Sequence, residues 1–319
     1  MRIYLKREFF SDREFVLVEN GSMKATAFRY STGIEALKVE NSKGYFIILP
    51  FKGQQIWRLH FLGKDLHMKT MMEEPQQSKV YLETYGAFLL HCGINAFGVP
   101  REGDTHVQHG EAPSADYQMA YVECGEDYIA VGGRFDYDKS FIKNYSFSPE
   151  CRLYKDDTVL KLHMVLENRR QKPMEYMYLC HINFRPIDGA EIIDTSDYKE
   201  KHRVGEGDQS GYDPEVCFSI SYKGDENNRA YTLQYTEEGA CYVNHPMDIL
   251  PVGVRWISRT GNEDSMGMVL PATAEPNGYT YAKEHGQLKI LGGNEKLEFD
   301  IETGYLEAEE ARRVKDICF

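Results

Sequence analysis

The sequence predicts an all-β fold, a sandwich or barrel, and three observations lead to this prediction. Short segments with alternating apolar and polar residues recur along the chain, separated by turn residues. Aromatic residues make up 13% of the chain and 22 of them are Tyr, a residue that favours half-buried pleated surfaces. Helix patterns are few. We expect one domain over residues 1–319, large enough to fold without a disulfide or a metal.

The strand pattern is clearest between Thr158 and Asn168. Its alternate positions Leu160, Leu162, Met164 and Leu166 are all apolar, so that face should meet a core. A hairpin is expected from 44–50 and 54–62 around the turn at 51–53. The other expected strands are peripheral ones within 1–43 and strands at 117–123, 128–137, 174–184, 216–222, 230–235, 253–258, 265–270, 287–291 and 296–301.

Two segments show helix patterns. A short helix is expected within residues 30–39, and a C-terminal helix within 306–317 has acidic residues early and basic residues late, as the helix dipole prefers. Residues 194–214 are polar, charged and contain glycine, which predicts a long loop over one face of the protein.

Charge and cysteine content exclude several classes of protein. The net charge is −13 and no run of Lys or Arg occurs, so nucleic acid and anionic membranes are not expected partners. No stretch is long and apolar enough for a membrane helix, and the first residues lack a signal-peptide core. The seven cysteines are irregularly spaced, which favours reduced thiols in the cytoplasm, with Cys180 packed rather than nucleophilic.

The densest polar cluster lies between Gly103 and Pro113. It contains Asp104, His106, His109 and Glu111 among turn residues, a pattern typical of a site on a loop or strand end. A Gly directly after His109 allows close approach of the backbone or a ligand to the imidazole. His106, His109 and Glu111, with His181 as a fourth ligand, could also bind a metal, but only a turn would bring positions 106 and 109 together.

Two further clusters carry polar residues at strand ends. His181, Asn183 and Arg185 fall on one face of the strand predicted at 174–184, where they could contact the hydroxyl groups of a ligand. The apolar strand at 265–270 should end at Pro271, and the loop that follows carries Glu275.

Three segments resemble one known family. They are Leu90-His-Cys-Gly-Ile-Asn-Ala-Phe-Gly98 followed by His109-Gly110, then Cys180-His-Ile-Asn-Phe184, then Leu270-Pro-Ala-Thr273 with Gly278 and Leu291-Gly-Gly-Asn-Glu295. Over residues 44 to 306 or so, the chain resembles the aldose 1-epimerase (galactose mutarotase-like) superfamily, and more closely its DUF4432 branch.

The resemblance implies a large antiparallel β-sandwich, the supersandwich, with few short helices and a sugar cleft across one sheet. It also implies cofactor-free and metal-free ring opening of an aldose, with His181 as general acid and His109 as a ring-binding helper. Asn183 and Arg185 become candidate hydroxyl contacts, and Arg185 could favour an acidic or phosphorylated sugar. The further candidate contacts are Arg58, Asn95, Asp104, His106 and Glu111.

The chain departs from the family where the general base is expected. Leu270 stands at the position of the family's glutamate, so either another acid acts as base, Glu275 first and Glu111 or Asp104 as alternatives, or the protein no longer epimerises. Three hypotheses follow: an aldose 1-epimerase-like enzyme, a carbohydrate-binding module without catalysis, or a metal-assisted sugar isomerase. In each the partner is a small-molecule sugar, and a homodimer is left open.

Overall fold

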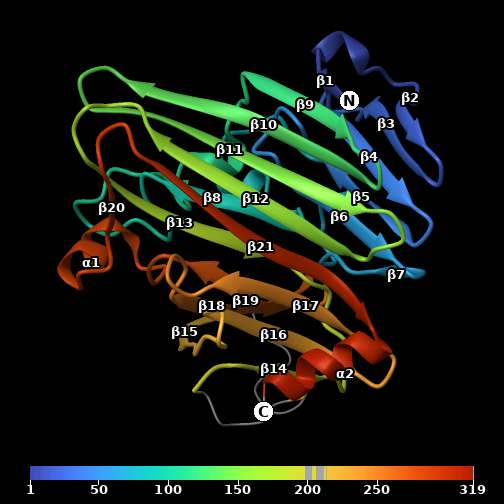
Figure 1. Cartoon of the computed structure of the whole chain (residues 1–319). Helices are drawn as coiled ribbons and strands as arrows, with labels where there is room; N and C mark the ends of the chain where they lie inside the picture. Colours follow the sequence, from blue (N-terminus) through green and yellow to red (C-terminus); the bar gives the residue numbers. More distant parts are fainter. Residues whose placement is uncertain (198–202, 206–211, 213, 319) are drawn as a thin grey trace.

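The computed structural model describes residues 1–197, 203–205, 212 and 214–318. Two large antiparallel sheets are stacked face to face and dominate the molecule (Figure 1). The predicted all-β sandwich is therefore confirmed. Among the described residues, no helix has the length and apolar character needed to cross a membrane.

One sheet has nine strands, and each neighbouring pair is antiparallel. Its order is β1-β9-β10-β11-β12-β21-β17-β16-β14. The bounds are β1 Arg2–Tyr4, β9 Met119–Cys124, β10 Tyr128–Lys139, β11 Lys143–Tyr154, β12 Val159–Asn168, β21 Lys296–Glu307, β17 Gly239–Pro246, β16 Arg229–Thr236 and β14 Glu191–Asp194. Strand β17, which the sequence analysis did not predict, lies inside this sheet.

The second sheet has twelve strands and carries the candidate site described below. Its main order is β15-β18-β19-β13-β8-β6-β5-β4-β3-β2, with β20 paired to β13 and β7 paired to β6. The bounds are β15 Val216–Ser221, β18 Val252–Arg259, β19 Asp264–Ala272, β13 Met174–Ile182, β8 Leu89–Ile94, β6 Ile56–Phe61, β5 Gly44–Ile48, β4 Glu35–Asn41, β3 Met23–Arg29, β2 Phe15–Asn20, β20 Lys289–Leu291 and β7 Lys64–Asp65. The hairpin predicted at 44–62 is formed by β5 and β6.

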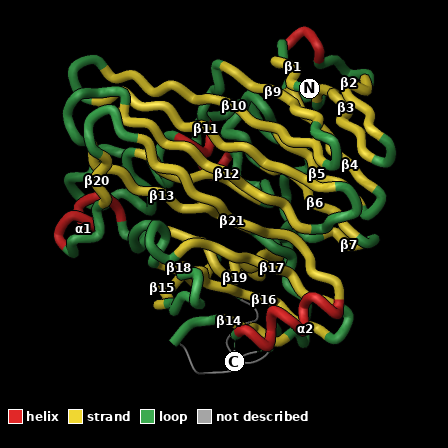
Figure 2. The backbone as a smooth tube through the Cα atoms, in the orientation of Figure 1, coloured by secondary structure: helices red, strands yellow, loops and turns green. Residues whose placement is uncertain are grey.

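Helices are few and lie outside the two sheets (Figure 2). They are α1 Gly278–Glu284, α2 Ala308–Ile317 and the single-turn 3₁₀ helices η1 Arg7–Phe9, η2 Tyr81–Glu83 and η3 Ala112–Ser114. The predicted C-terminal helix is confirmed by α2. Helix α1 was not predicted, because it follows a Pro- and Gly-containing segment without a clear apolar stripe.

One predicted element and one predicted boundary were wrong. The helix expected within 30–39 is instead the strand β4, which pairs with β3 and β5; the pairing buries Ala36, Leu37 and Val39 completely and overrides a weak local helix preference. Strand β19 does not end at Pro271 but continues to Ala272, where it pairs with β13. Of the loop predicted over 194–214, residues 198–202, 206–211 and 213 lie outside the described part of the chain.

The main core lies between the sheets, and side-chain alternation divides each strand between this core and the opposite face. In β12, Leu160, Leu162, Met164 and Leu166 are all buried in the core, as the alternation predicted. In β13, Tyr178 and Cys180 also belong to this core, and burial raises the pKa of the Cys180 thiol to about 12. Cys180 is thus a packed residue, and all seven cysteines are free.

The opposite face of the twelve-stranded sheet has its own apolar cluster. Leu179 of β13, Leu90 of β8 and Trp256 of β18 belong to it, together with residues of the covering segments such as Tyr81 and Tyr85. This face, and not the space between the sheets, is where the candidate site lies.

Candidate functional site

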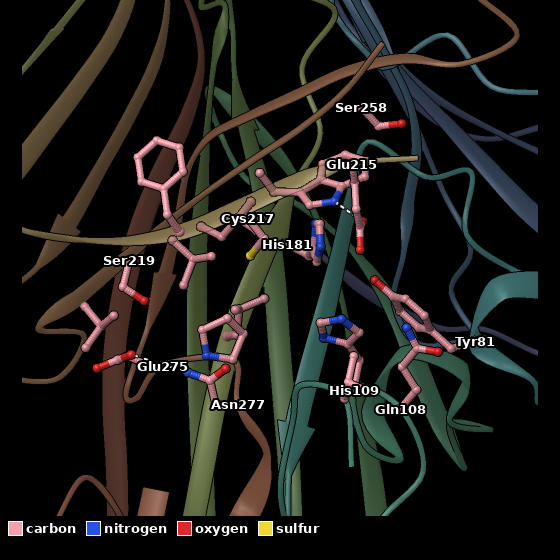
Figure 3. Close-up of a pocket in the computed structure, with 18 of the residues that line it drawn as sticks. Tyr81, Gln108, His109, His181, Glu215, Cys217, Ser219, Ser258, Glu275 and Asn277 are labelled. Atoms are coloured by element: carbon pink, nitrogen blue, oxygen red, sulfur yellow. Dashed lines mark hydrogen bonds between the residues drawn. The ribbon is translucent and has the colours of Figure 1, made fainter. Parts of the chain in front are cut away.

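A cavity of roughly 1080 Å³ opens on this outer face of the twelve-stranded sheet. Strands β13, β15, β18 and β19 provide its floor and one wall, and segments 81–85, 99–109 and 275–277 complete it. Figure 3 shows His109 and His181 pointing into the same space. A volume of this size is typical of a small-molecule pocket.

His181 lies on β13 and is held by a fixed partner. Its Nδ1 is 2.8 Å from Asn183 Oδ1, and Asn183 in turn donates from Nδ2 to the Ala87 carbonyl at 2.9 Å. An amide oxygen only accepts hydrogen bonds, so His181 donates from Nδ1 and its Nε2 is the nitrogen available to a ligand. The expectation that His181 and Asn183 share one strand face agrees with this contact.

His109 reaches the cavity from the polar loop that precedes η3. Its φ of +56° is left-handed, and the backbone of this loop is held by hydrogen bonds between His109 N and Gly98 O and between Gly93 N and His109 O. Gly110 has φ +80°, and a Cβ there would lie 2.3 Å from Ala96 O. Only glycine therefore allows the loop to pack this closely on the end of β8.

Three aromatic side chains hold the two imidazoles in place. The His109 and His181 ring centroids are 5.5 Å apart. The ring centroid of Tyr81 lies 4.5 Å from that of His109. The ring centroids of Tyr85 and Trp256 lie 5.2 and 5.5 Å from that of His181. The Tyr85 hydroxyl donates to Asn183 Oδ1 at 3.0 Å, so the aromatic frame and the histidine clamp form one unit.

Burial makes both imidazoles weak bases in the free protein. It lowers the pKa of His181 to about 3, with His109 contributing in the same direction and the hydrogen bond to Asn183 opposing the shift. Burial, with a smaller contribution from His106, lowers the pKa of His109 to about 4. Both rings are therefore uncharged near neutral pH.

Three carboxylates line the cavity, and they differ in their partners. Glu275 accepts hydrogen bonds from Asn277, Tyr281 and Gln287, and Figure 3 shows it beside Asn277. Glu215 accepts one from the indole nitrogen of Trp256, the ring that contacts His181. Glu263 has no side-chain hydrogen bond among the described residues. Leu270, where the family's base was expected, also lines the cavity.

Two of the predicted contact residues, Asn95 and Glu111, bind each other instead of the cavity. Glu111 Oε1 accepts from Asn95 Nδ2 at 2.7 Å, from the backbone nitrogens of Ile94 and Asn95, and from the Tyr145 hydroxyl. Burial raises the pKa of Glu111, and these hydrogen bonds oppose the shift. The pair secures the end of β8 beneath the His109 loop.

Asp104 and His106 lie outside the cavity as well. Asp104 Oδ1 accepts from the backbone nitrogen and the hydroxyl of Thr280 in α1, and His106 Nε2 is 3.4 Å from Asp104 Oδ2. Burial would raise the pKa of Asp104, but the hydrogen bonds from Thr280 and Arg101 bring it down to about 2. Asp104 thus joins the loop to α1.

Both predicted arginine contacts are placed elsewhere. Arg58 donates to the carbonyls of Trp57, Met72, Glu73 and Gly86, so it anchors the segment that leads to Tyr81. Arg185 follows the end of β13 and is exposed, so the alternation that places His181 and Asn183 in the site does not extend to it. Neither guanidinium lines the cavity.

The metal-binding arrangement considered from the sequence is not formed. His109 points into the cavity, His106 contacts Asp104, and Glu111 is held by Asn95 and Tyr145. In the part of the chain that the structure describes, no three His, Cys, Asp or Glu side chains are grouped as metal ligands.

The sequence analysis missed four residues that shape the site. Tyr81 and Tyr85 lie in an irregular segment where no period marks them, although two Tyr four residues apart was a visible signal. Trp256 lies on a predicted strand, in alternation with Val254 and Ser258, which also line the cavity. Glu215 directly follows the long polar loop predicted at 194–214.

Comparison with solved structures shows the fold class of this protein. The chain is similar to a "putative aldose 1-epimerase" from Klebsiella pneumoniae, with a TM-score of 0.80 and 16% identity over 95% of this chain and 90% of the other. It is also similar to a galactose mutarotase-like protein from Clostridium acetobutylicum, with a TM-score of 0.66 and 14% identity over 90% and 100% of the two chains. The fold is thus galactose mutarotase-like, as the sequence resemblance implied.

The family follows from a second comparison. The model of DUF4432, a domain of unknown function, matches residues 31–304, and the chain belongs to this family. No curated protein matches the sequence.

Proposed function

We propose that this protein is an aldose 1-epimerase-like enzyme that interconverts the anomers of a free sugar in the cavity of His109 and His181. The observation that carries the proposal is the meeting of these two imidazoles, from distant segments, at a centroid distance of 5.5 Å. They share a cavity with aromatic rings and carboxylates, the side chains that sugar rings and their hydroxyls require.

In the proposed reaction a carboxylate accepts the proton of the anomeric hydroxyl while His181, in its protonated imidazolium form, donates its Nε2 proton to the ring oxygen. The bond between C1 and the ring oxygen breaks, the aldehyde rotates, and the reverse transfers close the ring on either face. Asn183 holds His181 so that Nε2 faces the sugar, and His109 contacts the ring. Acid and base catalysis of this kind contributes on the order of 10²–10⁴-fold each.

Glu215 is the proposed base in place of the glutamate that Leu270 replaces. Its carboxylate accepts a hydrogen bond from Trp256, which contacts His181. Its charge contributes to raising the pKa of both Tyr81 and Tyr85. Glu275, the base expected from the sequence, already accepts three side-chain hydrogen bonds. The matched variants Glu215→Gln and Glu275→Gln separate the two assignments.

The test is NMR exchange spectroscopy of the anomeric protons over a panel of aldoses, with the uncatalysed rate subtracted. We expect His181→Ala to abolish the catalysed exchange and Glu215→Gln to reduce it by about 10²-fold or more, with Glu275→Gln reducing it less. Exchange that persists at the wild-type rate in the double variant His109→Ala/His181→Ala would contradict the proposal.

A second function, sugar binding without catalysis, is favoured by Leu270, because an apolar side chain occupies the family's base position in the cavity wall. This candidate predicts saturable binding of a sugar, measured by calorimetry, with no exchange above the solvent rate for any aldose that binds.

A further inference from the structure

The charges that line the cavity are unbalanced. The described lining residues include the carboxylates Glu215, Glu263 and Glu275 but only one permanent cation, Arg101. Both lining histidines have lowered pKa values because they are buried, and so they add no positive charge near neutral pH. An anion in this cavity would therefore meet more negative than positive charge.

Arg101 lies at the same end of the cavity as one of the carboxylates. The Arg101 guanidinium lies 4.7 Å from the centroid of the Tyr281 ring, and the Tyr281 hydroxyl donates to Glu275 at 3.2 Å. Arg101 and Glu275 therefore offset each other at that end.

The described residues near Trp256 offer no such compensation. Glu215 accepts a hydrogen bond from the uncharged indole, and neither Glu215 nor Glu263 forms an ion pair with a described residue. The neighbouring Arg259 is already paired with Asp188 and Asp264, both at 2.7 Å. The charges of Glu215 and Glu263 both contribute to raising the pKa of Tyr85, so the two carboxylates lie near the same part of the cavity.

Aromatic rings complete this acidic end. Tyr85 and Trp256 meet edge to face at 5.5 Å, and Tyr81 lies 5.1 Å from Tyr85. The Tyr81 hydroxyl is buried beside the Cys92 thiol, and its oxygen can accept a hydrogen bond from a ligand. Aromatic faces beside carboxylates form a favourable environment for an organic ammonium group.

We propose that the cavity selects sugars that carry an ammonium group over their neutral parents and excludes sugars that carry a phosphate or carboxylate. This inference rests on the proposed function only in taking a sugar as the ligand. It reverses the preference for acidic sugars that Arg185 suggested, because Arg185 is exposed and lies outside the cavity.

Calorimetry with three probes of one ring tests the inference. D-glucose, D-glucosamine and D-glucose 6-phosphate are titrated into the full-length protein at pH 6.5, and the same three forms of D-galactose are titrated in parallel. We expect the amino sugar of at least one series to bind about ten-fold tighter than its neutral parent, and the phosphate to bind at least ten-fold weaker. High salt should reduce both differences.

The variant Glu263→Gln isolates the contribution of charge, since it keeps the size of the side chain. It should lower the ratio of amino-sugar affinity to neutral-sugar affinity several-fold. The control Glu310→Gln removes the same charge from an exposed position on α2 and should leave the preference unchanged.

Equal or weaker binding of the amino sugar, tight binding of the phosphate, or no binding of any probe would overturn the inference. Failure of the proposed function gives a different result. If the amino sugar binds preferentially but its anomers exchange only at the solvent rate, selection by charge stands and catalysis does not. If neutral aldoses are epimerised without any preference for the ammonium group, catalysis stands and selection does not.

Discussion

At the scale of single residues, the site depends on how Asn183 and the surrounding protein control one imidazole. The hydrogen bond from Nδ1 to Asn183 decides which nitrogen faces the cavity, and burial decides how readily that nitrogen takes a proton. A general acid with a pKa of about 3 is protonated in only a small fraction of molecules at neutral pH. The pH dependence of kcat/KM reports this ionisation, because it follows the state of the free enzyme.

The pH profile is therefore a direct prediction. The protonated fraction of His181 rises up to ten-fold for each pH unit between neutrality and its pKa. We expect kcat/KM for anomer exchange, corrected for the solvent rate at each pH, to increase as the pH falls from about 8 to about 5. A profile that declines over this range would show that His181 does not act as the acid.

Asn183→Asp should shift this profile. A carboxylate at the Asn183 position favours the charged imidazolium, so the pKa of His181 should rise by at least about 1 unit, as NMR titration of its ring protons would show. Exchange at neutral pH should rise with it. His91, which faces Tyr178 on the other side of the sheet, is the internal control and its pKa should not move. An unchanged His181 titration would refute the role of Asn183 as the positioning residue.

At the scale of elements, the end of β8 and the loop that carries His109 act as one packed unit. Glu111 ties the loop to Asn95, Asp104 ties it to α1, and Gly110 lets its backbone approach the strand. Several polar residues that appeared from the sequence to contact substrate thus stabilise the loop that positions one histidine.

Gly110→Ala tests this packing. A Cβ at 2.3 Å from Ala96 O and 2.6 Å from Gly93 O forces the loop to shift, in addition to the cost of a left-handed φ. We expect a loss of about 3 kcal/mol in the free energy of unfolding in urea. Gly103→Ala, where φ is +91° and no atom lies within 4 Å of the added carbon, should cost only about 1 kcal/mol. Equal losses would mean that the close approach at Gly110 is unimportant.

At the scale of the whole molecule, buried histidines couple stability to pH. Burial lowers the pKa of His67 and His109 to about 4 and of His91, His181 and His245 to about 3. Below about pH 6.5 the unfolded chain binds protons that the folded chain does not. Each such group removes up to about 1.4 kcal/mol of stability per pH unit as the pH falls from 6.5 toward its folded-state pKa.

His245→Leu should weaken this dependence. His245 is fully buried near Tyr222, and neither ring nitrogen has a hydrogen-bond partner among the described residues. Replacing it with an apolar side chain should lower the slope of unfolding free energy against pH between pH 6 and pH 4.5. The decrease should correspond to about one fewer proton taken up on unfolding, measured by urea titrations at several pH values. Val243→Ala, in the same strand, should lower stability without changing the slope. An unchanged slope in His245→Leu would contradict a neutral buried imidazole.

Strand period and motif order by themselves determined the all-β class, the inward face of β12, the C-terminal helix, and the placement of His181, in β13, on the same side of the chain as Asn183, which directly follows β13. These features follow from local alternation, which a single strand displays in full. The helix expected within 30–39 was wrong because the pairing of β4 with both β3 and β5 decides that segment.

Only the tertiary structure decided the membership of the site. It brought His109 to His181 and placed Tyr81, Tyr85, Trp256 and Glu215 around them, whereas Arg58, Asn95, Asp104 and Glu111 were drawn into supporting contacts. The physical reason is that a polar side chain on a loop carries no mark of its eventual partner. That partner is set by packing between segments far apart in the chain, which no local pattern encodes.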